Sequence, residues 1–212
     1  MTGQFITFEG IEGSGKSTQI RILADYLKLR GHEVVTTREP GGTPIGEKIR
    51  RVLLNTEFKN MTPVTELLLY AAARCQHVQE VIAPAKETGK IILCDRYSDA
   101  TTAYQGAARH IDAKFLKAVH QLATGNLKPD LTILLDCPVE MGLQRVQERE
   151  PEIPGLANLD RFEQEKIDFH ERVRQGYLKI AKTEPQRVKV IDALAEVHAI
   201  HEKIAEEVMR IL

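Results

Sequence analysis

Short apolar runs alternate along this chain with longer segments in which apolar residues recur at helical spacing. The apolar runs predict strands at 4–8, 33–37, 90–94, 131–135 and 188–191. The run at 90–94 is almost entirely apolar, as expected for a strand that is covered on both faces. Because strands and helices alternate, the pattern predicts an α/β fold of three layers, in which a five-stranded parallel sheet is flanked by helices.

The longer segments predict helices at 18–30, 45–54, 62–87, 112–122 and 139–150, a further long helix that begins at Asp160, and a last one from 197 to 211. Thr62 is suited to cap the helix at 62–87, Pro63 suits its first turn, and Pro84 is suited to bend it. Asp112 is suited to cap the helix that follows it. Two prolines and a glycine predict an irregular loop at 151–158.

The composition fits one globular domain over residues 1–212. Apolar residues make up 42% and charged residues 28% of the chain, which allows one well-filled core. The formal net charge is −1, so no overall field attracts the protein to nucleic acid or to a membrane surface. The cysteines Cys75, Cys94 and Cys137 form no C-x-x-C pair, and no apolar run is long enough to span a bilayer. We therefore expect a cytoplasmic protein that binds neither nucleic acid nor membrane.

The most informative segment lies between the first predicted strand and the first predicted helix. It matches the pattern G-x-x-x-x-G-K-[ST], in which backbone N–H groups surround a polyphosphate. The lysine of this pattern reaches the outer phosphates, and the hydroxyl after it binds Mg²⁺. The chain is therefore expected to bind a nucleoside triphosphate. The residues expected to do so are Gly10, Ile11, Glu12, Gly13, Ser14, Gly15, Lys16, Ser17 and Thr18.

Polar residues follow each predicted strand, and the carboxyl ends of parallel strands meet at one edge of a sheet. Asp95 and Asp136 both follow buried strands, so one is expected to serve Mg²⁺ and the other to orient a loop. Asp95 is favoured because Arg96 is adjacent to it. Phosphoryl transfer also needs cations around the migrating group. The candidates are Lys16, Arg38, Arg50, Arg96 and Arg149.

Tyr70 and Arg74 are four residues apart on a predicted helix and therefore share one face. A ring and a guanidinium in this arrangement can stack on a nucleobase and hydrogen-bond to its edge. An aromatic core residue beside a surface arginine is nevertheless the more common arrangement at this spacing. The pattern by itself leaves the role of this pair open.

Several segments, in this order, resemble the bacterial thymidylate kinase family. They are Gly10–Thr18, Thr37–Thr43, Tyr70–Arg74, Asp95–Tyr97, Thr102–Gly106 and Leu159–Glu163. The resemblance continues to residues 191–193, so it covers nearly the whole chain. It implies transfer of the γ-phosphoryl group of ATP to dTMP, which gives dTDP for dTTP biosynthesis. It also implies Mg²⁺ as cofactor and a homodimer as the functional unit.

The resemblance implies roles for individual residues of the acceptor site. Tyr70 would stack on thymine, where the family more often has Phe, and Arg74 would bind a thymine carbonyl. Tyr104 would disfavour a 2′-hydroxyl on the sugar, and Glu12 would approach the 3′-hydroxyl. The other residues implied for dTMP are Arg38, Arg50, Arg96, Thr101 and Gln105.

The resemblance likewise implies residues for ATP, the metal and catalysis. Arg145 and Asp192 would join the phosphate loop in binding ATP, and Ser17 and Asp95 would hold the metal. The implied catalytic residues are Lys16, Asp95, Arg96 and Arg149.

Members of this family carry their catalytic arginine either in the phosphate loop or in a mobile lid. The loop of this chain has Glu12-Gly13-Ser14 and no arginine, so the resemblance implies a lid arginine within about 145–160. Arg149 is the first candidate, and Arg145 and Arg161 are the next. The insert at 151–158 makes this lid longer than is usual, so the choice among the three stays open. Closure of a lid excludes water that would compete for the phosphoryl group.

Other activities share parts of this pattern. A kinase for another nucleoside monophosphate or for a deoxynucleoside would share the phosphate loop, but it should lack the set formed by Tyr70, Arg74, Tyr104 and Gln105. A GTP-dependent switch would need N-K-x-D, and the segment 126–130 has one residue too many between Asn and Lys. A nucleic-acid ATPase is disfavoured by the near-zero net charge.

Overall fold

The computed structural model describes residues 3–148 and 160–212. Within these residues one parallel sheet has the strand order β2-β3-β1-β4-β5. The strands are β1 (Phe5–Glu9), β2 (Val34–Arg38), β3 (Ile91–Asp95), β4 (Leu131–Asp136) and β5 (Val188–Asp192). Each strand lies within one residue of the apolar run that predicts it. The five-stranded parallel sheet is therefore confirmed.

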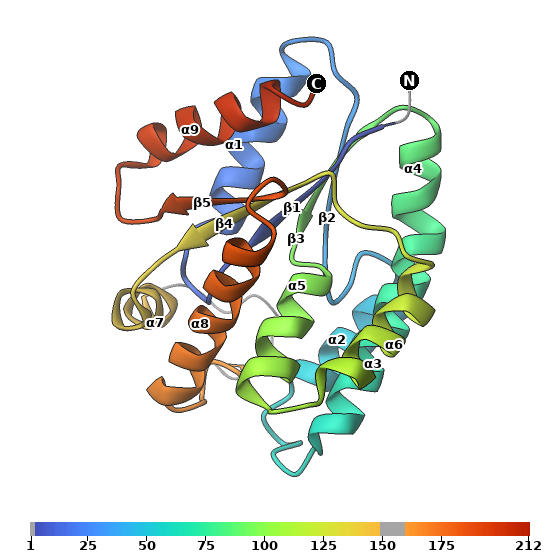
Figure 1. The fold of residues 1–212 in the computed structure, drawn as a ribbon, viewed down its shortest axis with the longest axis vertical. Coiled ribbons are helices and arrows are strands. Elements are labelled where there is room, and N and C mark those ends of the chain that lie inside the picture. The colour runs from blue at the N-terminus through green and yellow to red at the C-terminus, as the bar shows by residue number, and fades with distance from the viewer. Residues whose placement is uncertain (1–2, 149–159) are drawn as a thin grey trace.

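Helices cover both faces of this sheet (Figure 1). On one face α1 (Lys16–Lys28) packs against α9 (Val197–Met209). On the other face α8 (Ile167–Thr183) lies against β4, β5 and the helical run formed by α5 (Ser98–Thr101) and η2 (Thr102–Ala108). Side chains of the central strands are almost fully buried between these layers, which explains their continuous apolar runs. The predicted three-layer α/β architecture is thus confirmed.

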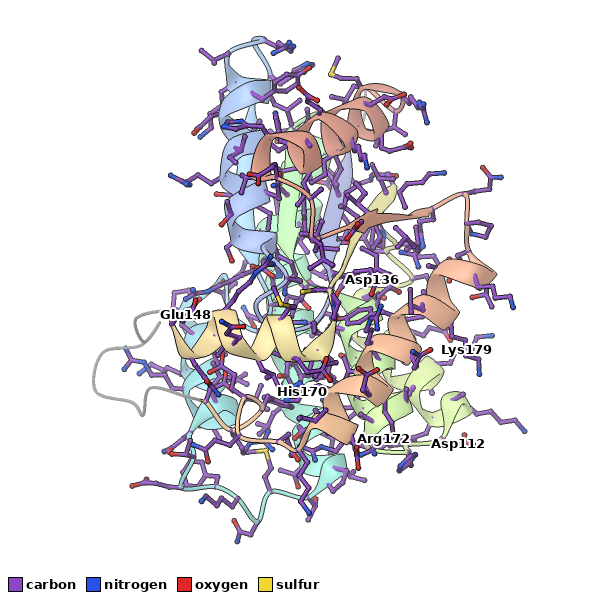
Figure 2. All side chains as sticks on the ribbon, turned by 90° about the vertical axis from the view of Figure 1, so that its left-hand side faces the viewer. Asp112, Asp136, Glu148, His170, Arg172 and Lys179 are labelled. Atoms are coloured by element: carbon purple, nitrogen blue, oxygen red, sulfur yellow. The ribbon has the colours of Figure 1, made fainter. Side chains whose placement is uncertain are left out.

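The remaining helices extend the molecule beyond the sheet. α2 (Pro44–Leu54) packs on α3 (Pro63–His77), and α3 packs on α6 (Ala113–Thr124). α7 (Val139–Gln147) lies next to α8, as the view in Figure 2 shows. Thr62 and Asp112 cap α3 and α6 through their side-chain oxygens, as predicted. No helix in the described part of the chain is both long and apolar enough to cross a membrane.

The predicted helix at 62–87 is continuous but not uniform. Between α3 and α4 (Ala83–Glu87) the chain forms a π-helical stretch, η1 (Val78–Ile82). This wider turn ends just before Pro84, a residue that has no N–H to donate to a preceding carbonyl. The irregularity near Pro84 is therefore a π turn ahead of the proline.

Two other helix predictions need correction. Asp160 opens only a turn: its carboxylate accepts hydrogen bonds from the N–H groups of Phe162 (2.8 Å) and Glu163 (2.9 Å), but the backbone of Lys166 is extended and interrupts the helix. The backbone N–H of Arg161 is bound to the Leu54 carbonyl, and α8 begins only at Ile167. In addition, α7 ends at Gln147, and residues 149–150 of the helix predicted there lie outside the described residues.

The helical run at 98–108 is missing from the sequence prediction. It contains the π-helical element η2, whose wider turns do not follow the 3.6-residue period by which helices are recognised. Several residues of the run 98–108 belong to the candidate site, because this run leads from the end of β3 to the cavity described next.

Candidate active site

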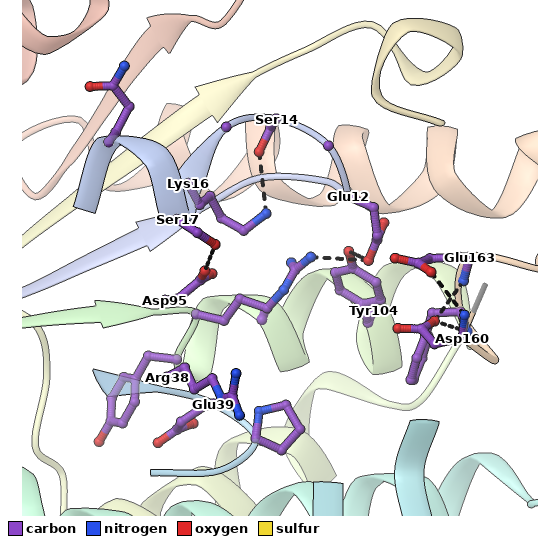
Figure 3. Close-up of a pocket in the computed structure, with 18 of the residues that line it drawn as sticks. Glu12, Ser14, Lys16, Ser17, Arg38, Glu39, Asp95, Tyr104, Asp160 and Glu163 are labelled. Atoms are coloured by element: carbon purple, nitrogen blue, oxygen red, sulfur yellow. Dashed lines mark hydrogen bonds and ion pairs between the residues drawn. The ribbon is translucent and has the colours of Figure 1, made fainter. Parts of the chain in front are cut away.

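A cavity of about 800 Å³ opens at the carboxyl edge of the sheet. Its walls come from the loop after β1, the ends of β2 and β3, helix α3, the run 98–108 and the segment after β5. Figure 3 shows Lys16 and Ser17 at one side of this cavity, with Glu12 and Tyr104 facing each other further along. The polar residues that follow β1, β2 and β3 line this cavity, whereas Asp136 after β4 and Asp192 after β5 do not.

The loop after β1 is held in a shape that only glycine allows at one position. Gly13 has φ 69°, and a Cβ atom there would lie 2.0 Å from the carbonyl oxygen of Gly142. The ammonium group of Lys16 donates to the carbonyl of Ile11 (2.8 Å) and to Ser14 Oγ (3.3 Å). Burial, together with the nearby Arg96 guanidinium, lowers the pKa of Lys16 to about 8. The loop therefore places a titratable cation at the N-terminus of α1.

Ser17 and Asp95 lie together, whereas Asp136 is occupied elsewhere. Ser17 Oγ donates to Asp95 Oδ2 over 2.8 Å. Asp136 instead receives two hydrogen bonds from Arg174, at 2.7 and 3.0 Å. A hydroxyl and a carboxylate suit Mg²⁺, which is usually held by one or two protein oxygens together with phosphate oxygens and water. No group of three or more His, Cys, Asp or Glu side chains that could hold a metal occurs among the described residues.

Arg96 has a left-handed backbone, with φ 69°, which is uncommon for a residue other than glycine. Its own N–H donates to the Phe8 carbonyl, and the next N–H, of Tyr97, donates to Glu9 Oε1 at 2.7 Å. These bonds fix the turn and direct the guanidinium to the Gly10 carbonyl (2.8 Å) and to Glu12 (3.1 Å). The strained turn thus places a cation between the phosphate loop and the rest of the cavity.

Glu9 lies fully buried beneath the phosphate loop. Its Oε2 is paired with the hydroxyl of Tyr177 at 2.7 Å, and Tyr177 also accepts a hydrogen bond from Arg96. Burial and the neighbouring Asp99 raise the pKa of Glu9 to about 8. This carboxyl group is therefore protonated at neutral pH and fixes the turn at Arg96 without adding a negative charge.

Glu12 is surrounded by hydrogen-bond donors. Its Oε1 accepts from Arg96 and from the Tyr104 hydroxyl, and its Oε2 lies 3.2 Å from Nδ1 of His170. Burial alone would raise the pKa of Glu12, but Arg96, His170 and Tyr104 outweigh it and hold that pKa well below its usual range. Glu12 is therefore a carboxylate that faces the cavity, not the ordinary surface residue that the pattern alone would indicate.

Arg74 is a buried residue and not a surface arginine. Its Nε donates to Glu39 at 2.7 Å, and one terminal nitrogen donates to the Tyr97 carbonyl (3.0 Å) and to Thr101 Oγ1 (3.1 Å). Glu39 also receives His77 Nδ1 at 2.9 Å. Burial opposes the charge on Glu39, but Arg74 and His77 outweigh it and lower the pKa of this carboxyl group. The network fixes the guanidinium plane where Arg74 lines the cavity.

The other residues predicted for the acceptor line the same cavity. The half-buried ring of Tyr70 meets Phe162 edge to face, with centroids 6.1 Å apart. The Gln105 amide donates to the buried Glu66 at 2.8 Å. The cavity-lining residues among those predicted for the acceptor are Glu12, Arg38, Arg50, Tyr70, Arg74, Arg96, Thr101, Tyr104 and Gln105.

The three candidate lid arginines have different surroundings. Arg145 lines the cavity and donates to the carbonyls of Gly13 (3.3 Å) and Ala193 (3.4 Å). Arg161 is buried and forms an ion pair with Glu66 at 2.6 Å, and it does not itself line the cavity, although Phe162 beside it does. Arg149 and the lid segment 149–159 lie outside the described residues.

Some lining residues were missed, and some predicted residues lie elsewhere. Asp192 does not line the cavity, because its carboxylate accepts the N–H of Leu194 at 2.9 Å. Gly10 and Ile11 belong to the phosphate loop but do not line the cavity. The lining residues without a sequence prediction are Gln19, Glu39, Pro40, Leu54, Tyr97, Ala100, Asp160, Phe162, Glu163, Ala193, Ala195, Val197 and Ile200. Many of these are apolar and look like ordinary core positions in the sequence, whereas Glu39 and Phe162 belong to segments that carried the family resemblance.

Comparisons with known proteins agree with this geometry. The thymidylate kinase family model matches residues 8–204. The chain is 55% identical over 192 residues to the thymidylate kinase of Geotalea uraniireducens, covering 90% of this chain and 89% of that protein. It is 57% identical over 189 residues to that of Syntrophotalea carbinolica, covering 89% and 87%. The crystal structure of thymidylate kinase from Ehrlichia chaffeensis superposes with a TM-score of 0.75 at 34% identity, covering 97% of this chain and 98% of that one. The chain belongs to the thymidylate kinase family.

Proposed function

We propose that this chain transfers the γ-phosphoryl group of ATP to dTMP and releases ADP and dTDP. The observation that carries the proposal is one continuous cavity that is lined both by a phosphate loop and by the ring and guanidinium pair of Tyr70 and the buried Arg74. Lys16 lies in the loop, Arg74 and Tyr70 line the other side, and Arg96 lies between them. Family membership supports the same reaction.

ATP would occupy the side of the cavity formed by the phosphate loop. Backbone N–H groups and the start of α1 favour the triphosphate, and Lys16 would exchange the Ile11 carbonyl for a phosphate oxygen. The adenine ring would lie on apolar residues from the segment after β5 and from α9, among them Ala193 and Val197. Arg145 would lie beside this ring.

The acceptor would occupy the side of the cavity that Arg74 lines. Tyr70 would stack on the thymine ring, and Arg74, fixed by Glu39, would donate to a thymine carbonyl. Arg38, Arg50 and Arg96 would hold the acceptor phosphate. The hydroxyl of Tyr104 is directed to Glu12, so its ring would stand where a 2′-hydroxyl would need space.

In the reaction, an oxygen of the dTMP phosphate forms a bond to the γ-phosphorus, and the bond from that phosphorus to the β–γ bridging oxygen breaks. The attacking oxygen is already ionised, so no general base is needed. Lys16 and Arg96 would hold the two phosphate groups in line and stabilise the charge that develops between them. Mg²⁺ held by Ser17 and Asp95 would supply further positive charge to the β- and γ-phosphate oxygens.

We also propose the organisation in which the reaction takes place. The chain would act as one thymidylate kinase domain, residues 1–212, with a lid at about 145–160, and as a homodimer, which the family resemblance supports. A cytoplasmic setting is supported by the free thiols of Cys75, Cys94 and Cys137. Size-exclusion chromatography with light scattering would test the dimer.

The experiment that tests the function is an ADP-release assay with ATP and Mg²⁺. The acceptor panel should contain dTMP, dUMP, dCMP, dGMP, UMP and thymidine. We expect dTMP to give the highest kcat/KM. A higher value for another monophosphate, or for thymidine itself, would transfer the proposal to that acceptor.

A further inference from the structure

His170 lies at the N-terminal part of α8, beside α7 (Figure 2). Its side chain is fully buried, and Nδ1 lies 3.2 Å from Oε2 of Glu12, a residue of the phosphate loop. No role for His170 follows from the sequence patterns, because a histidine on a helix between Phe169 and Glu171 reads as one more core position. The contact instead connects α8 directly to a carboxylate that lines the cavity.

The two oxygens of Glu12 have different surroundings. Arg96 and Tyr104 donate to Oε1. Oε2 is buried, makes no well-aligned hydrogen bond within the described residues, and has His170 as its nearby partner. Because Oε2 is turned into the protein, the Oε1 side of the carboxylate is the side that can meet a ligand in the cavity.

The hydrogen-bond chemistry of this pair fixes the proton on the histidine ring. Glu12 is ionised and can only accept hydrogen bonds, so Nδ1 of His170 must carry a proton if it is to bind Oε2. Phe169 meets the His170 ring edge to face, with centroids 5.5 Å apart, and limits its rotation. A ring without an N–H donor in this place would leave the buried Oε2 of Glu12 with no donor to replace the water that it loses on folding. Burying a charged oxygen in this way costs free energy.

We propose that His170 is a positioning residue for acceptor binding: it holds Oε2 of Glu12 inside the protein and so keeps Oε1 aligned for the 3′-hydroxyl of a deoxynucleoside monophosphate. This inference rests on the proposed function and on the contact between Glu12 and that hydroxyl, which the family resemblance implies. Without His170 the carboxylate turns to satisfy Oε2, and the hydroxyl loses its aligned acceptor.

The test compares two acceptors that differ only at the 3′ position, dTMP and 3′-deoxythymidine monophosphate. The variants are His170→Phe, which removes the donor and keeps an aromatic ring, and His170→Asn, whose amide N–H can take the place of Nδ1–H. His201→Phe is the matched control, because His201 lies on α9 against Tyr26 and does not line the cavity. Thermal melting of each variant monitors the fold.

We expect His170→Phe to lower kcat/KM for dTMP by about tenfold, chiefly through KM, and to change that for the 3′-deoxy acceptor by less than about twofold. His170→Asn should recover most of the loss, and it keeps the test decisive if the Phe variant folds poorly. His201→Phe should leave the ratio between the two acceptors unchanged.

Other outcomes overturn the inference in distinguishable ways. An equal loss with both acceptors, or no loss with either, would show that His170 has no part in reading the 3′-hydroxyl. A Glu12→Gln variant that lowers kcat/KM equally for both acceptors, or for neither, would show that Glu12 does not contact the 3′-hydroxyl, and the inference about His170 would be overturned with that contact. If dTMP itself were no substrate for the unaltered protein, the proposed function would fail, and the inference would fail with it.

Discussion

Ser17 Oγ donates a hydrogen bond to Asp95 Oδ2 over 2.8 Å, which joins the phosphate loop to the end of β3. The register of the sheet explains the meeting. Phe8 of β1 lies beside Asp95 of β3, so the loop that leaves β1 passes the Asp95 carboxylate. The register of the sheet therefore brings the two oxygens together.

This pair predicts that Asp95 supports the metal and Asp136 does not. We expect Asp95→Asn to raise the Mg²⁺ concentration needed for half-maximal activity, and to lower kcat by about 10²-fold, because one charged ligand is lost. The measurement is a Mg²⁺ titration of the ADP-release assay. Asp136→Asn is the control: it weakens the pair with Arg174 and should lower the melting temperature without shifting the Mg²⁺ titration. A shift of equal size in both variants would contradict the assignment.

The lowered pKa of Lys16 predicts a pH dependence for ATP binding. The free enzyme should lose the Lys16 charge as the pH rises through about 8, so kcat/KM for ATP should fall above that pH, approaching tenfold per unit. Bound phosphate favours the charged form, so the fall in kcat should begin at a higher pH. Initial rates measured at several ATP concentrations and pH values give the alkaline limb of kcat/KM for ATP and that of kcat.

Two variants identify the group responsible for that limb. In Lys16→Arg the charge does not titrate in this range, so the fall near pH 8 should disappear even if activity is lower. In Glu9→Gln the fall should remain, although Glu9 titrates at a similar pH. Loss of the limb in the Glu9 variant alone would assign it to Glu9.

Glu9 predicts a change in stability with pH. Its pKa is about 8 in the folded protein against 4.5 for the ordinary group, so between these pH values the folded state holds a proton that the unfolded state has lost. The free energy of unfolding should therefore fall as the pH rises from about 4.5 to 8, by up to about 1.4 kcal/mol per unit from this group. Glu9→Gln mimics the protonated acid and should show a shallower fall. The measurement is urea unfolding of both proteins at several pH values from 5 to 8. An equal change with pH in the free energy of unfolding of the two proteins would contradict the assignment.

The sheet and the phosphate loop could be predicted because both depend on local residue patterns. Buried strands such as Ile91–Asp95 are nearly continuous apolar runs, and the loop combines glycines, Lys16 and Ser17 at fixed spacing. The carboxyl ends of parallel strands must then meet at one edge, which placed Asp95 and Arg96 correctly beside the loop.

The buried polar contacts could not be predicted, because they join residues far apart in the chain. His170 meets Glu12 and Arg74 meets Glu39 only once the fold has formed. The helix predicted from Asp160 failed for a local reason. Asp160 does cap a turn, but the N–H of Glu165 binds the Phe162 carbonyl three residues back, and the backbone of Lys166 is extended, so the helix resumes only at Ile167. No residue pattern in this segment predicts that break.

Arg74 combines a structural and a proposed binding role, and the two can be separated. Arg74→Ala removes the guanidinium partner of the buried Glu39 and leaves it only His77, so we expect a loss of about 3–5 kcal/mol in the free energy of unfolding. The KM for dTMP should also rise far more than that for ATP. Arg187→Ala breaks a partly buried pair, with Asp99 at 2.7 Å, and neither of these residues lines the cavity. It should destabilise the protein while leaving both KM values near normal. Equal KM effects in the two variants would remove the binding role from Arg74.

The three candidate lid arginines should give three different results when each is replaced by alanine. Arg149→Ala should lower kcat by at least about 10²-fold, because a lid arginine would stabilise charge that develops only in the transition state. Arg145→Ala should raise the KM for ATP, since Arg145 donates to the loop at Gly13 and to Ala193 beside the proposed adenine site. Arg161→Ala breaks the buried pair with Glu66 and should lower the melting temperature instead. Steady-state kinetics and melting curves measured on the same preparations separate these outcomes. A mild effect on kcat for Arg149→Ala, with a large one for Arg145→Ala, would transfer the catalytic role to Arg145, which already lies against the loop.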